Sequence, residues 1–262
     1  MEKTKRKLTK VHIIIIGSVS VALVAGLIIG LVLGLRETPR TTQEWLNEFR
    51  NAIDNFNLVN EDGSNLERRF ERRIEIFDND ELIVQFHQSV EVAYQDEKLV
   101  ARLKVTEEYP TLNTNEFNIR DEFYLIDSRM FALRVDGDSQ QITHFESSME
   151  IFFELVDNNI GGQGYEFNEN NFDTLYITHS DNAHNMTANI AQERLSYFFI
   201  GNSNAVQFSD VSLEIFITDD LNLKSFTLRY TDSNGRNVII QIRTLEPREM
   251  ILGDWVQNFF NS

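Results

Sequence analysis

The chain has 262 residues, of which 24 are Lys or Arg and 41 are Asp or Glu, so its formal net charge is −17. Because such an acidic surface repels phosphate groups, the composition argues against nucleic acid as a partner. The sequence contains no Cys, which excludes disulfides and leaves stability to an apolar core.

The first 35 residues have the pattern of a membrane anchor. Five basic residues lie within residues 1–10, and residues 11–35 carry no charge. A helix of 25 residues is roughly 37 Å long, which is enough to cross the hydrocarbon core of a bilayer. We therefore expect a cytoplasmic basic tail (1–10), a transmembrane signal-anchor helix (11–35), a linker (36–40) and an extracytoplasmic domain (41–262).

The bias of Lys and Arg toward the amino end predicts a single-pass protein of the cell membrane with a cytoplasmic N-terminus. A cleaved signal peptide is the alternative. Its best small-residue site, Ser20 to Ala22, lies inside the apolar run, and cleavage there would leave an apolar new terminus. The uncleaved anchor is therefore favoured.

Small residues recur every four positions within this segment, at Ser18, Ala22, Gly26, Gly30 and Gly34. On a helix they share one face, where small side chains let two backbones approach closely. This ladder predicts a homo-oligomer or a partner helix. The alternative is that Gly, Ala and Ser are simply common in transmembrane helices.

An amphipathic helix is expected directly after the linker. Thr41 and Glu44 form a capping box, and apolar residues follow at helical spacing: Trp45, Leu46, Phe49, Ala52, Ile53 and Phe56. This stripe is expected to pack on a sheet. The alternative, a helix lying on lipid, is disfavoured because its polar face is acidic.

Beyond residue 67 the apolar period changes from helical spacing to two. Apolar and polar residues alternate, and turn signals separate the runs, which is typical of an antiparallel meander. A second helix is predicted after the capping box of Ser147 and Glu150, ending at Gly161-Gly162. The expected strands are 82–94, 99–106, 117–125, 131–135, 172–178, 186–191, 194–200, 211–218, 223–231 and 236–245.

These elements predict a β-rich α+β fold. About eleven antiparallel strands are too many for a flat open sheet, so we expect them to curl into an unclosed barrel, or half-barrel. An N-terminal amphipathic helix and an inserted helix accompany the strands, and one transmembrane helix precedes them. A short apolar tail, residues 255–260, is expected to pack back as a helix.

The order of elements over residues 41–246 resembles the periplasmic lipoprotein-carrier superfamily, which includes LolA-, LolB- and RseB-like proteins. The best local match is an apolar strand, an acidic turn and a returning strand over 213–224, then the turn 232–236 and the strand 238–240. The resemblance implies a concave apolar surface that holds an acyl chain, and hence a lipid or a lipoprotein as partner. The membrane anchor departs from this family, whose members are usually soluble or lipid-tethered.

Six aromatic residues are the candidates for lining or covering such a cavity: Trp45, Phe49, Phe86, Phe123, Phe152 and Phe153. A half-barrel fills its interior either with side chains or with a ligand, so the alternative is a packed core.

No sequence motif of an enzyme, a phosphate-binding loop, a zinc protease or an EF-hand is present. We therefore expect no catalytic activity, no cofactor and no metal.

A metal site at His179, Asp181 and His184 is conceivable, but the spacing matches no zinc motif, and solvated loop residues are the simpler interpretation. The Asp78 to Asp80 and Asp136 to Asp138 segments are better explained as hairpin turns than as calcium ligands. Asn185 begins an N-x-T sequon, which matters only in a glycosylating source.

The function that these observations favour is a single-pass membrane protein whose outer domain binds a lipid, another apolar ligand or a lipoprotein. The alternative is a cell-surface protein-binding or adhesion module, or a membrane-anchored sensor subunit, with no ligand cavity.

Overall fold

The computed structural model describes residues 40–54, 68–95, 98–111, 119–136, 139–148, 150–152, 156, 164–246 and 248–260. The chain divides into two compact units, Met1–Thr41 and Thr42–Ser262, and nearly all of the described residues belong to the second. The predicted tail, anchor and small-residue ladder lie outside them. None of the helices in the described ranges is long and apolar enough to cross a bilayer.

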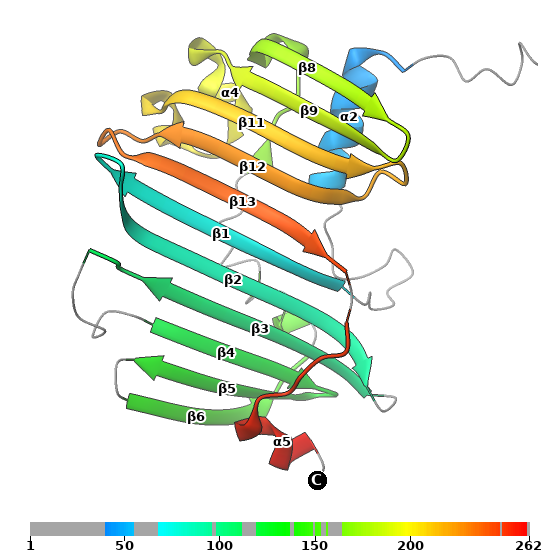
Figure 1. Ribbon diagram of the computed structural model, residues 1–262, viewed down its shortest axis with the longest axis vertical. Helices are drawn as coiled ribbons and strands as arrows, with labels where there is room; N and C mark the ends of the chain where they lie inside the picture. Colours follow the sequence, from blue (N-terminus) through cyan, green and yellow to red (C-terminus); the bar gives the residue numbers. More distant parts are fainter. Residues whose placement is uncertain are drawn as a thin grey trace, which may run out of the picture. The chain divides into compact units, whose positions relative to one another are not determined.

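The second unit is dominated by one antiparallel sheet of eleven strands (Figure 1). The strand order is β6-β5-β4-β3-β2-β1-β13-β12-β11-β9-β8, and within the described residues the sheet is not closed into a barrel. Its strands are β1 (Arg68–Asp78), β2 (Glu81–Gln95), β3 (Lys98–Glu108), β4 (Ile119–Ile126), β5 (Arg129–Asp136), β6 (Ser139–Glu146), β8 (Phe172–Ser180), β9 (Ala183–Ile190), β11 (Ser209–Thr218), β12 (Leu223–Thr231) and β13 (Asn237–Leu245).

The remaining elements are short. They are the helices α2 (Thr42–Asp54), α4 (Leu195–Phe198) and α5 (Asp254–Phe260), the 3-10 turns η2 (Glu169–Asn171), η3 (Gln192–Arg194) and η4 (Ser203–Gln207), and the paired strands β7 (Gly164–Tyr165) and β10 (Phe199–Ile200). Residues 150–152 and Val156 are also helical.

The β12–β13 hairpin shows how local sequence sets the strand register. Gly235 has a φ of +79°, a left-handed conformation that favours glycine. The Asp232 carboxylate accepts hydrogen bonds from the backbone N–H groups of Asn234 and Arg236, at 2.8 and 3.0 Å. The turn predicted at 232–236 is therefore present, and it places Thr231 opposite Asn237. Asn234 does not share the positive φ of Gly235, so the turn is not the type I′ that an Asn-Gly pair favours.

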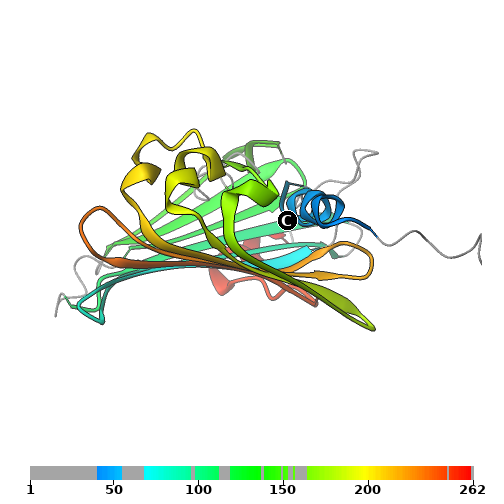
Figure 2. The same ribbon diagram turned by 90° about the horizontal axis from the view of Figure 1, so that it is seen from above.

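The sheet has an inner and an outer face, and strand alternation assigns each side chain to one of them. In β2, Gln88 and Val90 lie on the inner face, whereas His87 and Glu91 lie on the outer face. Figure 2 shows α2 and α4 over the inner face and α5 under the outer face.

Three apolar clusters stabilise this arrangement. The α2 cluster joins α2 and the short elements of residues 165–208 to the inner face of β9, β11, β12 and β13. The Phe152 cluster joins Phe152 and Val156 to the inner face of β1 to β5. The Trp255 cluster joins the C-terminal segment of Met250, Leu252, Trp255 and Val256 to the outer face of β3 to β5.

One predicted strand is wrong. Residues 194–200 form the end of η3, then α4, and only Phe199–Ile200 are a strand. Leu195, Phe198 and Phe199 are all buried, and their spacing of i, i+3 and i+4 is that of a helix face rather than of alternation. The capping of the inserted helix also differs, because Ser148 Oγ, not Ser147, accepts a hydrogen bond from the Ile151 N–H at 3.4 Å.

Candidate functional site

The structure divides the six predicted cavity residues between two regions instead of gathering them. Trp45 and Phe49 belong to the α2 cluster, where Phe49 is fully buried and Trp45 is half-buried. Phe152 is fully buried in the Phe152 cluster, and Phe153 lies outside the described residues. Phe49 and Phe152 therefore fill cores and do not line a space.

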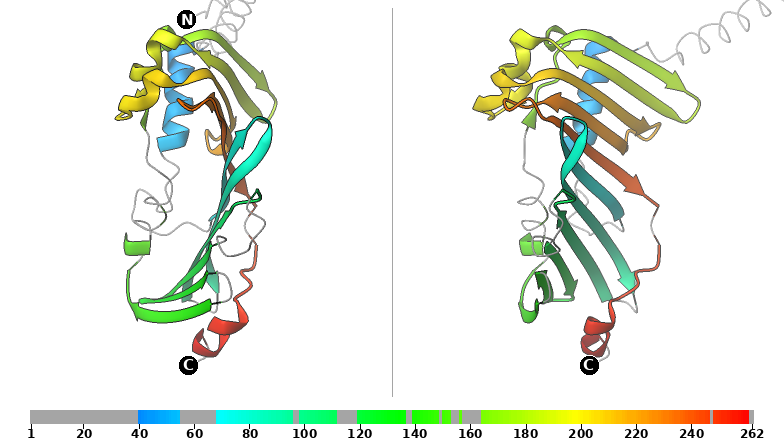
Figure 3. Two further views of the ribbon diagram at one scale, coloured as in Figure 1. Left: turned by 90° about the vertical axis from the view of Figure 1, so that its left-hand side faces the viewer. Right: turned by 60° about the vertical axis from the view of Figure 1, so that its left-hand side comes forward.

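Phe86 and Phe123, like Trp45, keep part of their side chains exposed. Both lie on the inner face and are half-buried, with Phe86 opposite Ile74 of β1 and Phe123 between Leu103 and Ala132. Figure 3 shows the curvature of β4 to β6, the strands around Phe123, at the end of the sheet away from α2.

A groove of about 240 Å³ lies beside Phe123 on the inner face of β4 to β6. Its lining residues are Asp121, Phe123, Ala132, Leu133, Arg134, Gln141 and Thr143. The volume is a little below the range typical of small-ligand sites, which is about 300–1,000 Å³. The described groove can therefore hold a small ligand or part of a longer one.

The groove has an apolar floor and a charged rim. Phe123 and Ala132 form the floor, and Arg134 pairs with Asp121 through two hydrogen bonds, Nε to Oδ1 at 2.7 Å and Nη2 to Oδ2 at 2.6 Å. Such a bidentate pair fixes the guanidinium in one orientation. The combination suits an amphipathic molecule with an apolar part and a polar head.

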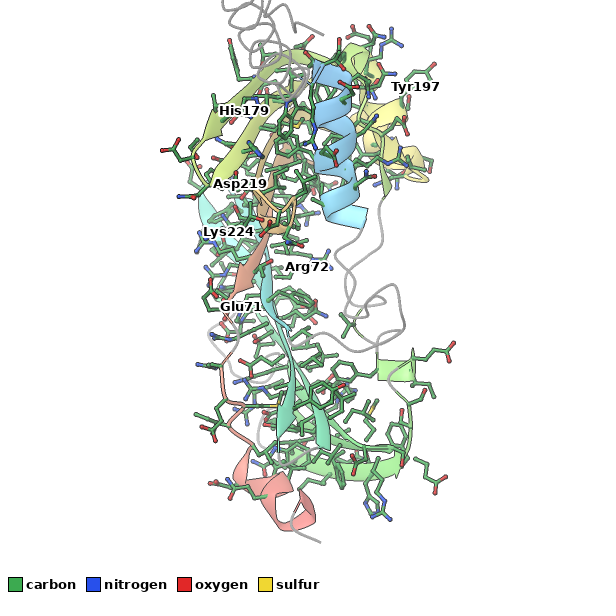
Figure 4. The ribbon with its side chains drawn as sticks, turned by 90° about the vertical axis from the view of Figure 1, so that its right-hand side faces the viewer. Glu71, Arg72, His179, Tyr197, Asp219 and Lys224 are labelled. Atoms are coloured by element: carbon green, nitrogen blue, oxygen red, sulfur yellow. The ribbon has the colours of Figure 1, made fainter. Side chains whose placement is uncertain are left out.

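A buried polar band separates the α2 cluster from the Phe152 cluster on the inner face. It consists of Arg72 of β1 and Gln88 of β2, which are 5% and 0% exposed and lie opposite one another, together with Tyr165 of β7, whose ring also packs against the α2 cluster. Gln88 Nε2 donates to the Val156 carbonyl at 3.3 Å. Figure 4 shows Arg72 on the α2 side of the sheet and its neighbour Glu71 on the opposite side.

Burial dominates the titration of this band. Desolvation lowers the pKa of Arg72 to about 10, and the nearby Tyr165 hydroxyl opposes that change. Desolvation also raises the pKa of Tyr165 to about 12, and the charge of Arg72 opposes it. Both shifts show that charge is costly in this buried part of the inner face.

The two histidines of the β8–β9 hairpin lie on its strands and not in its loop, although His179 is exposed. His179 and His184 lie directly opposite one another across the paired strands, with their Nδ1 atoms 3.0 Å apart. The Trp45 ring contacts both, at centroid distances of 4.6 and 4.4 Å. Asp219, not Asp181, is the carboxylate near them, with Oδ1 3.5 Å from His184 Nε2.

The outer face carries ion pairs centred on a buried carboxylate. Glu91 is 4% exposed, and Arg69, Arg102 and Arg248 approach its oxygens at 2.7, 2.6 and 3.1 Å. Arg102 also donates to the Ile251 carbonyl at 3.3 Å. This network ties the C-terminal segment to the sheet.

The comparisons with known proteins supply no identity. No protein-family model matches the chain, and no curated protein matches it. A crystal structure of an N-terminal dehydratase from the difficidin assembly line matches over 74% of this chain and 82% of that chain, with 11% identity and a TM-score of 0.14. A score this low shows neither a shared fold nor a shared activity, so the resemblance to lipoprotein carriers stays a prediction.

The features that sequence reasoning missed are the polar band and the charged rim. Arg72 lies at an inward position of β1, between Phe70 and Ile74. A single polar residue within a run of alternating apolar residues was the sequence feature that could have indicated the polar band. Arg134 and Asp121 come from separate strands, so their pairing becomes visible only once the register of β4 and β5 is known.

Proposed function

We propose that the domain binds an amphipathic ligand of the lipid class on the inner face of a half-barrel, close to the membrane that anchors it. The groove beside Phe123 carries this proposal, because an inner-face aromatic stays half exposed there while Phe49 and Phe152 are sealed. A lipid or the acyl chain of a lipoprotein supplies the apolar part that such a floor would take.

The groove rim supports a ligand with a polar head group. Arg134 is 61% exposed and is held in one orientation by its bidentate pair with Asp121, so a carboxylate or phosphate at the edge of the groove can reach its guanidinium. The half-barrel resemblance agrees with this proposal, since its family holds acyl chains on the corresponding surface.

The test is to fill the groove without disturbing the sheet. Thr143 and Gln140 are both exposed on edge strand β6, but Thr143 lines the groove and Gln140 lies on the outer face. Thr143→Trp should weaken binding of a fluorescent fatty acid to the purified full-length protein by about tenfold or more, whereas Gln140→Trp should leave it unchanged.

Lipid extraction of the full-length protein, followed by mass spectrometry, gives an independent measurement. Recovery of a lipid from the wild type but not from the Thr143→Trp variant supports the proposal. Equal binding by the wild type and both Trp variants would refute it.

A protein-binding role is a second candidate, favoured by exposed apolar side chains on α4, β10 and η4. Tyr197, Ile200 and Val206 are 62%, 46% and 55% exposed, and the Arg194 guanidinium lies 5.6 Å from the Tyr197 ring centroid. Aromatic and Arg side chains are enriched in protein interfaces. Replacing Tyr197 and Val206 with Ser should then abolish adhesion or partner binding without changing fatty-acid binding.

The anchor is proposed to set both location and assembly. Residues 11–35 would span the cell membrane with the N-terminus in the cytoplasm, and the ladder from Ser18 to Gly34 would mediate helix contact. Substituting Gly26 and Gly30 with Ile should weaken self-association in a membrane two-hybrid assay. An unchanged signal would remove the ladder from the proposal.

A further inference from the structure

We propose that His179 and His184 form a binding site for a divalent transition-metal ion of the Zn²⁺ class, at the end of the β8–β9 hairpin beside α2. The site is separate from the groove at Phe123 and does not rest on the proposed lipid-binding function.

The spacing of the two imidazoles carries the proposal. His179 and His184 are a cross-strand pair, and their Nδ1 atoms are 3.0 Å apart. Zinc–nitrogen bonds are about 2.0–2.1 Å long, so two nitrogens on one ion at an angle near 90–100° are about 3 Å apart. In the metal-free protein the two Nδ1 atoms share one proton. When both rings are deprotonated at Nδ1, the two atoms can instead bind one metal ion.

The surroundings of His184 favour the tautomer that a metal needs. Asp219 Oδ1 lies 3.5 Å from His184 Nε2, and a carboxylate on that side of the ring favours the tautomer with the proton at Nε2 and the lone pair at Nδ1. Metal-binding histidines typically have this arrangement, with a carboxylate that accepts from the second ring nitrogen. Figure 4 shows His179 and Asp219 at the same end of the sheet.

Trp45 limits the movement of both rings. Its indole packs at 4.6 Å from the His179 centroid and 4.4 Å from the His184 centroid. Because α2 presents Trp45 to the hairpin, the helix fixes the direction in which the two imidazoles meet. The side chain of His184 is only 15% exposed, whereas His179 is exposed and gives an ion a path from solvent.

The protein would supply two ligands and leave the other positions open. Within the described ranges, no group of three or more His, Asp or Glu side chains is placed to hold a metal. Zinc prefers four ligands, so water or an external donor would complete the shell, as at the open position of catalytic zinc sites. Nitrogen ligands also favour Cu²⁺ and Ni²⁺, with Cu²⁺ expected to bind most tightly.

Trp45 provides a direct optical test, because the chain has only two Trp residues. In full-length protein carrying Trp255→Phe, Trp45 is the remaining indole, and Cu²⁺ or Ni²⁺ bound at the histidines should quench its fluorescence. The quenching should saturate at one ion per chain, and a large excess of Zn²⁺, which does not quench, should compete with Ni²⁺ and restore the signal. Calorimetric titration of the wild type with Zn²⁺ gives the same answer if the Trp255 variant does not fold.

Substitutions of the hairpin residues distinguish a specific metal site from nonspecific binding of metal ions to the protein surface. His179→Gln and His184→Gln should each weaken binding more than tenfold, and Asp219→Asn should weaken it about tenfold by releasing the His184 ring. His144→Gln is the control, because His144 is an exposed histidine on β6, far along the sheet order from β8. Equal affinity of the wild type and both hairpin His variants, or no saturable Zn²⁺ binding by the wild type, would overturn the proposal.

Discussion

The α2 cluster and the Phe152 cluster lie on the same inner face but are covered in different ways. At the first, α2, α4 and the short elements around β7 and β10 seal the sheet with contacting aromatic rings, such as Phe198 against Phe199 at 5.0 Å. At the second, Phe152 and Val156 cover the centre, and Phe123 borders an open groove. An alternating strand thus indicates which face is apolar, but the elements above it decide whether that face becomes core or binding surface.

The largest difference between the two regions should appear on truncation of an aromatic residue. Phe198 is fully buried and touches Tyr165, Phe167, Phe172 and Phe199. Phe198→Ala should lower the free energy of unfolding by about 3–5 kcal/mol, because it removes a whole ring from a packed core. Phe123→Ala should cost less than half as much, as judged by urea denaturation. Equal losses would mean that the groove is as well packed as the α2 cluster.

A second large effect is expected on the outer face, beneath the Phe152 cluster. Glu91→Ala would leave three Arg side chains without their shared carboxylate and should lower the free energy of unfolding by about 3 kcal/mol. Glu75→Ala is the matched control, since its contact with the half-exposed Arg73 is 3.7 Å long and should contribute less than about 1 kcal/mol. Thermal unfolding of the two variants measures the contrast.

The polar band between the regions predicts a loss of stability in alkali. The pKa of Tyr165 is raised from 10.0 to about 12, so between these values the folded phenol keeps a proton that the unfolded one releases. Stability from Tyr165 is therefore complete below pH 10 and is lost as the pH rises toward 12, by up to about 2–3 kcal/mol.

Tyr165→Phe should flatten this decline and remove a tyrosine that titrates late by ultraviolet absorbance. The lowered pKa of Arg72 acts in the opposite direction and is coupled to Tyr165, so the ultraviolet titration of the tyrosine is the more direct of the two measurements. Tyr197→Phe, at an exposed tyrosine outside the polar band, is the matched control.

The smallest expected effect on stability concerns the groove rim. Arg134 is 61% exposed, so Arg134→Gln should change the free energy of unfolding by no more than about 0.5–1 kcal/mol, despite its bidentate pair. Fatty-acid affinity should fall severalfold if the rim contacts the head group. A variant that loses stability but not affinity would assign Arg134 to the fold alone.

The sequence predicted the sheet well where turns and alternation agree. The expected strands 223–231 and 236–245 match β12 and β13 to within a residue, because Asn234-Gly235 sets the turn. Strands β6 and β1 were not predicted. Strand β6 has no buried side chain and therefore no apolar alternation, and in β1 the many Arg and Glu residues obscure the alternation of Phe70, Ile74 and Ile76. The predicted strands 172–178 and 186–191 stop two and three residues short of the hairpin turn that joins β8 to β9. The pairing of His179 with His184 could therefore not be predicted.

The site was less predictable than the fold for a physical reason. The sequence indicates which aromatic residues face inward, but it does not show that α2 seals Phe49 while Phe123 borders a groove. Likewise, the Glu91 network joins residues from β1, β2, β3 and the C-terminal segment, and no local pattern connects them.

The pairing of β1 with β13 has a consequence for the timing of folding. Residues 69–77 find their partners at 237–245, so the centre of the sheet joins positions separated by more than half of the chain. Contacts of such long range are slow to form, because the intervening loop must close first. During synthesis, β1 can pair with β2 as soon as that hairpin is made, but its other edge has to wait for β13, so the β1–β6 meander is expected to form first, with the β1 edge still unpaired. The segment from β13 through Arg248 to α5 then joins the two parts of the sheet.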